Sequence, residues 1–279
     1  MKGPDIPLRR VVPEPRDELA TTWRQARPAR IGESLEAALS RDPGGWYVVG
    51  ASSDVGRSSV TRTIAGREIV LWRGEDGDLR AGPGSCPHMG ALLDGCEITA
   101  GQVRCRWHGM ALDENTGASW PTMPALDDGA LLWVRIDTPG ETPAEAPRLA
   151  ARPDVSRSLV GVVARPAVCE PRDIIANRLD PWHGTWFHPY AFSHLHVDES
   201  LSSPERLVLD VTFQVTGSIG VPVTADFTCP DARTIVMTII KGEGEGSDDE
   251  THATPQGTDR HGRPETKKTE ATNARTPRP

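Results

Sequence analysis

The chain has 279 residues, 25% of them charged, and a formal net charge of −8. Such a length supports one large domain or two modest ones with a real core, and the negative charge argues against a nucleic acid partner. No run approaches the roughly 20 apolar residues of a transmembrane segment, and residues 1–12 lack the apolar stretch of a secretory signal. Five scattered cysteines are too few for a disulfide scaffold. We therefore expect a cytoplasmic protein.

The first half of the chain predicts a small antiparallel β domain. Residues 1–45 form a lead-in, which is rich in Pro and Arg and includes a short helix over 32–40. From residue 46 to 137 short apolar runs alternate with glycine turns, which is typical of short antiparallel strands. The clearest strand candidates are residues 46–50, 67–73, 102–106 and 131–136.

The second half predicts a sheet with a helix packed on it. Residues 138–157 are rich in proline and form the expected linker. A partial catalytic domain follows over 158–241, so the whole chain has an α+β fold. Its expected elements are a strand at 158–168, a helix at 171–188, and strands at 206–215, 221–229 and 233–240.

The last segment, residues 242–279, contains no Val, Ile, Leu, Met, Phe, Trp, Tyr or Cys. A segment without large apolar side chains cannot offset its ordering entropy by burial. We therefore expect a polar, disordered tail, or at most a weakly held edge strand.

Four possible metal ligands lie in two glycine-rich turns. Cys86 and His88 form a C-x-H motif, and after sixteen intervening residues Cys105 and His108 form C-x-x-H. A pair of thiolates and a pair of imidazoles suit a [2Fe–2S] cluster with a raised reduction potential. The alternative is a zinc-stabilised binding module, although zinc sites more often use C-x-x-C and H-x-x-x-H pairs.

The segments CPHMG and CRWHG resemble the Rieske domain of the Rieske non-haem iron oxygenases, the family of aromatic-ring-hydroxylating alpha subunits. The respiratory Rieske proteins differ by an additional cysteine after each loop. Ala91 and Arg106–Trp107 stand at those places here. The resemblance therefore favours the oxygenase class.

A second group of candidate ligands follows about 75 residues later. Asp180, His183 and His188 form D-x-x-H-x-x-x-x-H, and Asn177 precedes them by three residues. The three-residue spacing places Asp180 beside His183 on one helix face, whereas His183 and His188 converge only if the turn near Gly184 loosens. Two histidines and a carboxylate are the usual ligands of an oxygen-activating Fe(II).

The resemblance assigns roles to these residues. It implies that His183 and His188 bind a mononuclear Fe(II), and that Asn177 lies near the iron. Asp180 would connect an iron ligand to a cluster histidine of a neighbouring subunit in a head-to-tail homotrimer. A ferredoxin or flavin reductase would supply electrons, and O2 would oxidise a small organic substrate, such as an apolar aromatic or isoprenoid one.

The chain departs from the family pattern at the third iron ligand, an aspartate expected more than a hundred residues after the second histidine. Only 91 residues follow His188. The available acids are Asp198, Asp226, Asp231, Asp248 and Asp249, and the sequence singles out none of them. A Rieske electron-transfer protein with a non-catalytic second domain is therefore the alternative prediction.

Overall fold

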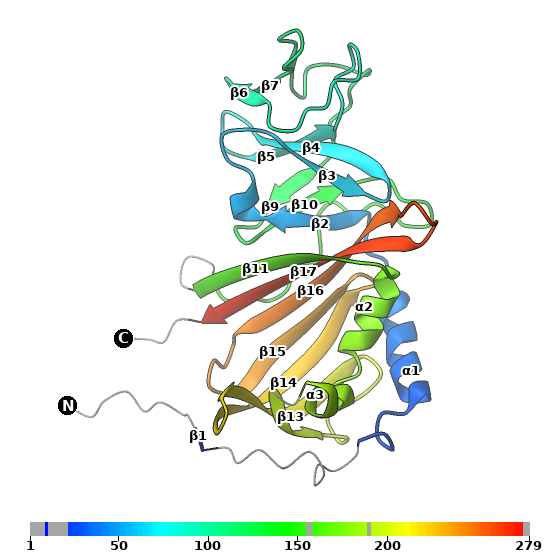
Figure 1. Cartoon of the computed structure of the whole chain (residues 1–279), viewed down its shortest axis with the longest axis vertical. Helices are drawn as coiled ribbons and strands as arrows, with labels where there is room; N and C mark the ends of the chain where they lie inside the picture. The colour runs from blue at the N-terminus through cyan, green and yellow to red at the C-terminus, as the bar shows by residue number, and fades with distance from the viewer. Residues whose placement is uncertain (1–8, 11–21, 155–157, 189–190, 276–279) are drawn as a thin grey trace, which may run out of the picture.

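A computed structural model describes residues 9–10, 22–154, 158–188 and 191–275. The described chain forms two β-rich units stacked one above the other (Figure 1). None of the helices in these ranges is long and apolar enough to cross a membrane. The predicted lead-in over residues 1–8 and 11–21 lies outside the described residues.

The upper unit contains three small antiparallel sheets, as the short apolar runs predict. Its elements are β2 (Trp46–Ala51), η1 (Ser52–Asp54), β3 (Val60–Ile64), β4 (Arg67–Arg73), β5 (Leu79–Pro83), β6 (Glu97–Thr99), β7 (Gln102–Arg104), β8 (Ala111–Leu112), β9 (Ala125–Asp127) and β10 (Leu131–Arg135). Strand β4 is apolar on both faces, since Ile69 and Leu71 join one core cluster while Val70 and Trp72 join another. The second cluster also contains Cys86 and lies beneath the two glycine-rich turns.

The lower unit is an antiparallel sheet with helices on one face (Figure 1). Its strand order is β11-β17-β16-β15-β14-β13-β12, and the short β1 (Arg9–Arg10) pairs with β14. The strands are β11 (Ser158–Ala167), β12 (Phe192–Val197), β13 (Arg206–Thr216), β14 (Ile219–Asp231), β15 (Thr234–Gly242), β16 (Asp248–Thr258) and β17 (Pro264–Arg275).

Three helices in the described ranges cover this sheet. They are α1 (Pro28–Leu39), α2 (Pro171–Arg178) and α3 (Trp182–Phe187). Helices α1 and α2 each begin with a proline, whose fixed φ suits the first helical turn. Ala38, Ile175 and Trp182 bring the three helices into one apolar cluster with the sheet. The predicted α+β class, a helix-on-sheet unit after a small β domain, is confirmed.

The single helix expected over residues 171–188 is divided in two. Helix α2 ends at Arg178, and α3 starts at Trp182. Pro181 explains the break, because it has no backbone N–H and disfavours a helical conformation in the residue before it. The break places Asp180 between the helices, next to the first candidate histidine.

The expectation of a disordered tail at 242–279 is wrong. Strands β16 and β17 continue the sheet to Arg275, and β17 lies between β16 and β11 rather than at an edge. Polar side chains pair with one another inside this hairpin: the Asn273 amide nitrogen donates to Asp248 at 3.0 Å, and a His252 ring nitrogen lies 3.1 Å from Glu250. The predicted domain boundary at residue 241 therefore falls inside the sheet.

A buried arginine from the linker connects the two units. Arg152 donates to Asp128 of the upper unit at 2.8 Å and to Glu250 of β16 at 2.9 Å. The three side chains are only 8%, 4% and 0% exposed. Nearby, the Thr254 hydroxyl donates to the Val48 carbonyl at 2.7 Å. The two units are thus held together by polar contacts that are shielded from water.

Replacing Arg152 with methionine should lower the free energy of unfolding by about 3 kcal/mol, because Asp128 and Glu250 would remain buried without their cation. Urea denaturation followed by circular dichroism measures this difference. Arg165→Met, on the exposed edge strand β11, is the matched control and should change stability by less than about 0.5 kcal/mol. Equal effects of the two substitutions would contradict the bridging role of Arg152.

Candidate metal centres and the adjoining pocket

The two predicted cluster loops have the same backbone geometry. The Gly90 N–H donates to the Cys86 carbonyl and the Gly109 N–H to the Cys105 carbonyl, both at 2.8 Å. Each cysteine N–H in turn donates to a carbonyl five residues on. The glycines adopt φ values of +72° and +70°, which side-chain-bearing residues rarely adopt. Glycine therefore allows both chains to turn back tightly around a cysteine.

The four candidate ligands converge as two pairs. Cys86 and Cys105 are buried, whereas His88 and His108 are exposed, with ring centroids 4.8 Å apart. Burial raises the pKa of the Cys86 thiol. At Cys105 burial is outweighed by hydrogen bonds from the Trp107 N–H and from Cys86, so its pKa is lowered. A buried sulfur pair and a solvent-facing imidazole pair fit a [2Fe–2S] cluster with one pair on each iron.

The tip of this unit has an exposed apolar rim. Met89, Leu92 and Trp107 are all exposed, next to the two histidines. Large apolar side chains gathered at an exposed tip are a common feature of interaction surfaces.

The second group of ligands lies where α2 gives way to α3. The rings of His183 and His188 are 5.4 Å apart between centroids, and His188 follows the last residue of α3 with φ −117° and ψ 51°. This departure from helical geometry lets two histidines five residues apart face one pocket. His183 Nδ1 lies 2.5 Å from the Asp180 carbonyl and 3.7 Å from its carboxylate.

Asp180 influences His183 electrostatically. Its carboxylate, and then its carbonyl, raise the pKa of His183 above 6.5, although burial acts in the opposite direction. Its Oδ1 atom is buried and has no hydrogen-bond partner in the described part of the chain. Asn177 lines the same pocket one turn earlier, and its carbonyl accepts from the Asp180 N–H at 3.4 Å.

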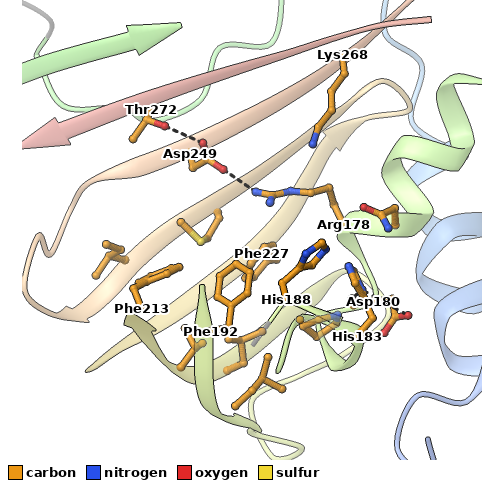
Figure 2. Close-up of a pocket in the computed structure, with 18 residues that line it drawn as sticks. Arg178, Asp180, His183, His188, Phe192, Phe213, Phe227, Asp249, Lys268 and Thr272 are labelled. Carbon is orange, nitrogen blue, oxygen red and sulfur yellow. Dashed lines mark hydrogen bonds and ion pairs between the residues drawn. The ribbon is translucent and has the colours of Figure 1, made fainter. Parts of the chain in front are cut away.

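A pocket of about 490 Å³ opens beside the two histidines (Figure 2). Most of its wall is apolar, and the sheet supplies nearly all of these side chains. They are Phe192, Leu195, Leu209, Val211, Phe213, Phe227, Met237 and Ile239. Arg178, Asp249, Lys268 and Thr272 form a polar wall of the same pocket, and Arg178 lies near enough to His183 for its charge to oppose the rise in the pKa of that histidine. The size and lining suit a small organic molecule.

Of the five aspartates considered as a third iron ligand, only Asp249 lines the pocket. Its carboxylate accepts from Arg178 at 2.6 Å and from Thr272 at 3.0 Å. Within the described ranges, no three His, Cys, Asp or Glu side chains lie close enough together to hold one metal ion. No carboxylate in these ranges therefore joins His183 and His188 as a third ligand.

The polar wall was not predicted from the sequence. Arg178 directly follows Asn177 and could have been found by its position in the motif. Lys268 and Thr272 belong to β17, whose polar sequence predicted a tail. No signal short of strand pairing would have placed them in the pocket that contains His183.

Comparisons with known proteins agree with the two-unit fold. A family model described as Rieske [2Fe-2S] domain matches residues 45–132, and one described as Domain of unknown function (DUF5914) matches residues 138–279, more than half of the chain. The Rieske match confirms the predicted cluster and disfavours the zinc alternative. The crystal structure of dicamba monooxygenase bound to dicamba superposes with a TM-score of 0.63 at 17% identity, covering 83% of this chain and 77% of that one.

Curated relatives include oxygenase components. The putative toluene-4-sulfonate monooxygenase system iron-sulfur subunit of Comamonas testosteroni is 25% identical over 215 residues, 72% of this chain and 60% of the relative. The oxygenase component of dicamba O-demethylase from Stenotrophomonas maltophilia is 25% identical over 158 residues, 51% of this chain and 46% of the relative. The expected resemblance to Rieske oxygenase components is confirmed, and the matches cover about half the length of these relatives.

Asp180→Asn should lower the pKa of His183 in the metal-free protein, because the neutral amide no longer stabilises the imidazolium. The pKa of His183 is higher in the folded protein than its ordinary value of about 6.5. The contact between Asp180 and His183 therefore stabilises the metal-free fold fully below pH about 6.5. This stabilisation is lost as the pH rises through the folded-state pKa of His183. An NMR titration of the His183 ring measures the change. The control, Asp210→Asn, changes an exposed residue of β13 and should leave the titration of His183 unaltered. An unaltered titration in Asp180→Asn would contradict the contact.

Proposed function

Since the chain belongs to the family described as Domain of unknown function (DUF5914) and carries a Rieske [2Fe-2S] domain, we propose that it is an O2-dependent oxygenase of an organic substrate. The observation that carries the proposal is the pocket, because it brings His183 and His188 to one end of an apolar cavity. An electron-transfer domain alone would not require such a cavity.

The residues of the chain fit two iron centres. Cys86, His88, Cys105 and His108 would hold the cluster, and His183 and His188 would hold a mononuclear Fe(II). When bound, the cluster would supply single electrons, and the Fe(II) would activate O2. Asp180 would orient the His183 ring: its backbone carbonyl accepts a hydrogen bond from Nδ1–H, which leaves the Nε2 lone pair available to a metal.

The pocket walls would position the substrate and exclude water. Phe192, Phe213 and Phe227 offer flat apolar surfaces, and an organic ring or chain placed against them would reach the histidine pair. Asn177 would contact the substrate or the iron surroundings from α2.

We further propose a head-to-tail homotrimer in which Asp180 connects the centres of adjacent copies. A hollow of about 360 Å³ lies on the outer side of Asp180 and His183, lined by Trp23, Trp182 and Trp186. The Asp180 side chain is 29% exposed, and a cluster histidine of a second copy could donate to the exposed part of its carboxylate. The apolar rim at Trp107 supplies a complementary surface. A ferredoxin or flavin reductase is the proposed electron donor.

The alternative is a Rieske electron-transfer protein whose second unit does not turn over. The ion pair between Asp249 and Arg178 favours it, because the one aspartate among the five that lines the pocket is already neutralised. Iron stoichiometry separates the two functions.

Protein reconstituted without air should contain about three iron atoms per chain, two in a cluster and one high-spin Fe(II). His183→Ala should remove about one iron and leave the optical and EPR spectra of the cluster intact, whereas Cys105→Ser should abolish those spectra. His194→Ala is the control and should retain all the iron. About two irons in wild type, even after repletion, would refute the oxygenase proposal and support the alternative.

Trp107→Glu should convert the trimer to smaller species while keeping the cluster spectrum, because a charge would enter the proposed interface. Trp107 is 58% exposed, so the fold itself should tolerate the change. Light scattering after size-exclusion chromatography measures the mass. Leu159→Glu, also apolar and 71% exposed but on β11, should leave the trimer intact. A monomeric wild-type protein would rule out the proposed assembly.

A further inference from the structure

The buried polar cluster at the junction of the two units contains more acidic than basic side chains. We infer that Asp248 holds a proton in the folded protein and donates it to Asn273, and that loss of this proton loosens the contact between the units. Neither residue lines the pocket, so the inference does not depend on the proposed oxygenase function.

Asp248 and Asn273 form a cross-strand pair with one donor too few. They lie directly opposite each other on β16 and β17, and the Asn273 amide nitrogen donates to Asp248 Oδ2 at 3.0 Å. The other side-chain oxygen of each residue, Oδ1 in both, is buried and has no hydrogen-bond partner in the described part of the chain. Buried acceptors without a donor destabilise a fold. A proton on Asp248 Oδ1 would supply that donor, and Asn273 Oδ1 would accept it.

The charges around Asp248 favour its neutral form. Arg152 is shared between Asp128 and Glu250, at 2.8 Å and 2.9 Å, so it does not neutralise Asp248 as well. A His252 ring nitrogen lies 3.1 Å from Glu250. Even a protonated His252 would leave three negative charges against two positive ones. A buried carboxylate without its own cation tends to take up a proton, because the neutral acid costs much less to bury.

The strands beside this pair add no buried charge. The neighbour of Asp248 on β15 is Thr238, and Val160 of β11 lies opposite Asn273. Arg275, two residues after Asn273 on the same face of β17, is exposed to water, which screens its charge.

The proton belongs to Asp248 and not to Glu250. Burial and the charge of Glu250 raise the pKa of Asp248 to about 7, although the Asn273 hydrogen bond and the charge of Arg152 act in the opposite direction. At Glu250, burial is outweighed by the contacts with His252 and Arg152, which lower its pKa.

The stability of the fold should therefore decrease as the pH rises toward neutrality. In the unfolded chain Asp248 has the ordinary aspartate pKa of about 3.9. The stabilisation by the protonated pair is fully present below pH about 4 and is lost as the pH rises through the folded-state pKa of about 7. The ionised Asp248 then adds a negative charge beside the Arg152 bridge that joins the two units.

The direct test is an NMR titration of the iron-loaded protein with carbon-13 in the aspartate carboxyl groups. We expect the Asp248 carboxyl to titrate near pH 7. Its resonance is assigned from its own backbone, so this measurement also decides the case if a variant does not fold. Titration of Asp248 below pH about 5 would overturn the proton site.

Asp248→Asn, which keeps the shape of the side chain but is always neutral, tests the consequence for the fold. In urea denaturation, the unfolding equilibrium constant of wild type divided by that of the variant should rise more than about tenfold between pH 5 and pH 8. Asp210→Asn, on β13, is the matched exposed control and should give a constant ratio. A constant ratio for Asp248→Asn as well would overturn the inference.

Amide hydrogen exchange, compared at the same pH, tests the effect on the junction. Strands β2, β16 and β17 should exchange faster in wild type than in Asp248→Asn at pH 8, and this difference should shrink at pH 5. A pH-dependent difference confined to other segments would overturn the loosening of the contact between the units.

Discussion

Both units depend on how the side chains of the β16–β17 hairpin alternate between the two faces of the sheet. Along β17, Lys267, Thr269, Ala271 and Asn273 face the Rieske unit and the linker, while Lys268 and Thr272 face the pocket. One polar hairpin therefore serves as the docking surface of the upper unit and as a pocket wall. A shift of one residue in its register would exchange the two sets of side chains. The buried contacts of Asp248, Glu250 and Asn273 fix that register.

Those contacts explain why the sequence predicted the first half of the chain better than the end. Strands such as β4 and β10 have continuous apolar runs. The tendency of such a run to be buried can be predicted from the segment alone. The end of the chain lacks them, and its order depends on partners: Glu250 is stabilised by Arg152, 98 residues away, and by Asn273. Paired polar groups avoid the cost of burial that an isolated one incurs. A rule based on apolar content alone does not include this compensation.

The candidate ligands were predictable because their geometry is local. Each cluster cysteine needs only a glycine four residues later and the hydrogen bond that closes the turn, so its motif determines most of the loop. The spacing of His183 and His188 likewise required a departure from helical geometry, and that departure occurs at the end of α3. The residues that the sequence did not reveal, Arg178 with Asp249 and Lys268, meet only because α2, β16 and β17 come together in three dimensions.

The pairing of Arg178 with Asp249 also bears on the third iron ligand. Asp249 lies on the pocket wall, but Arg178 accompanies it from the residue next to Asn177, so the carboxylate enters the cavity already neutralised. A metal held by two neutral imidazoles would keep its full positive charge and have more open positions than one with a bound carboxylate. The polar wall would not add to that charge, because each of its cations is paired, Arg178 with Asp249 at 2.6 Å and Lys268 with Glu270 at 2.8 Å.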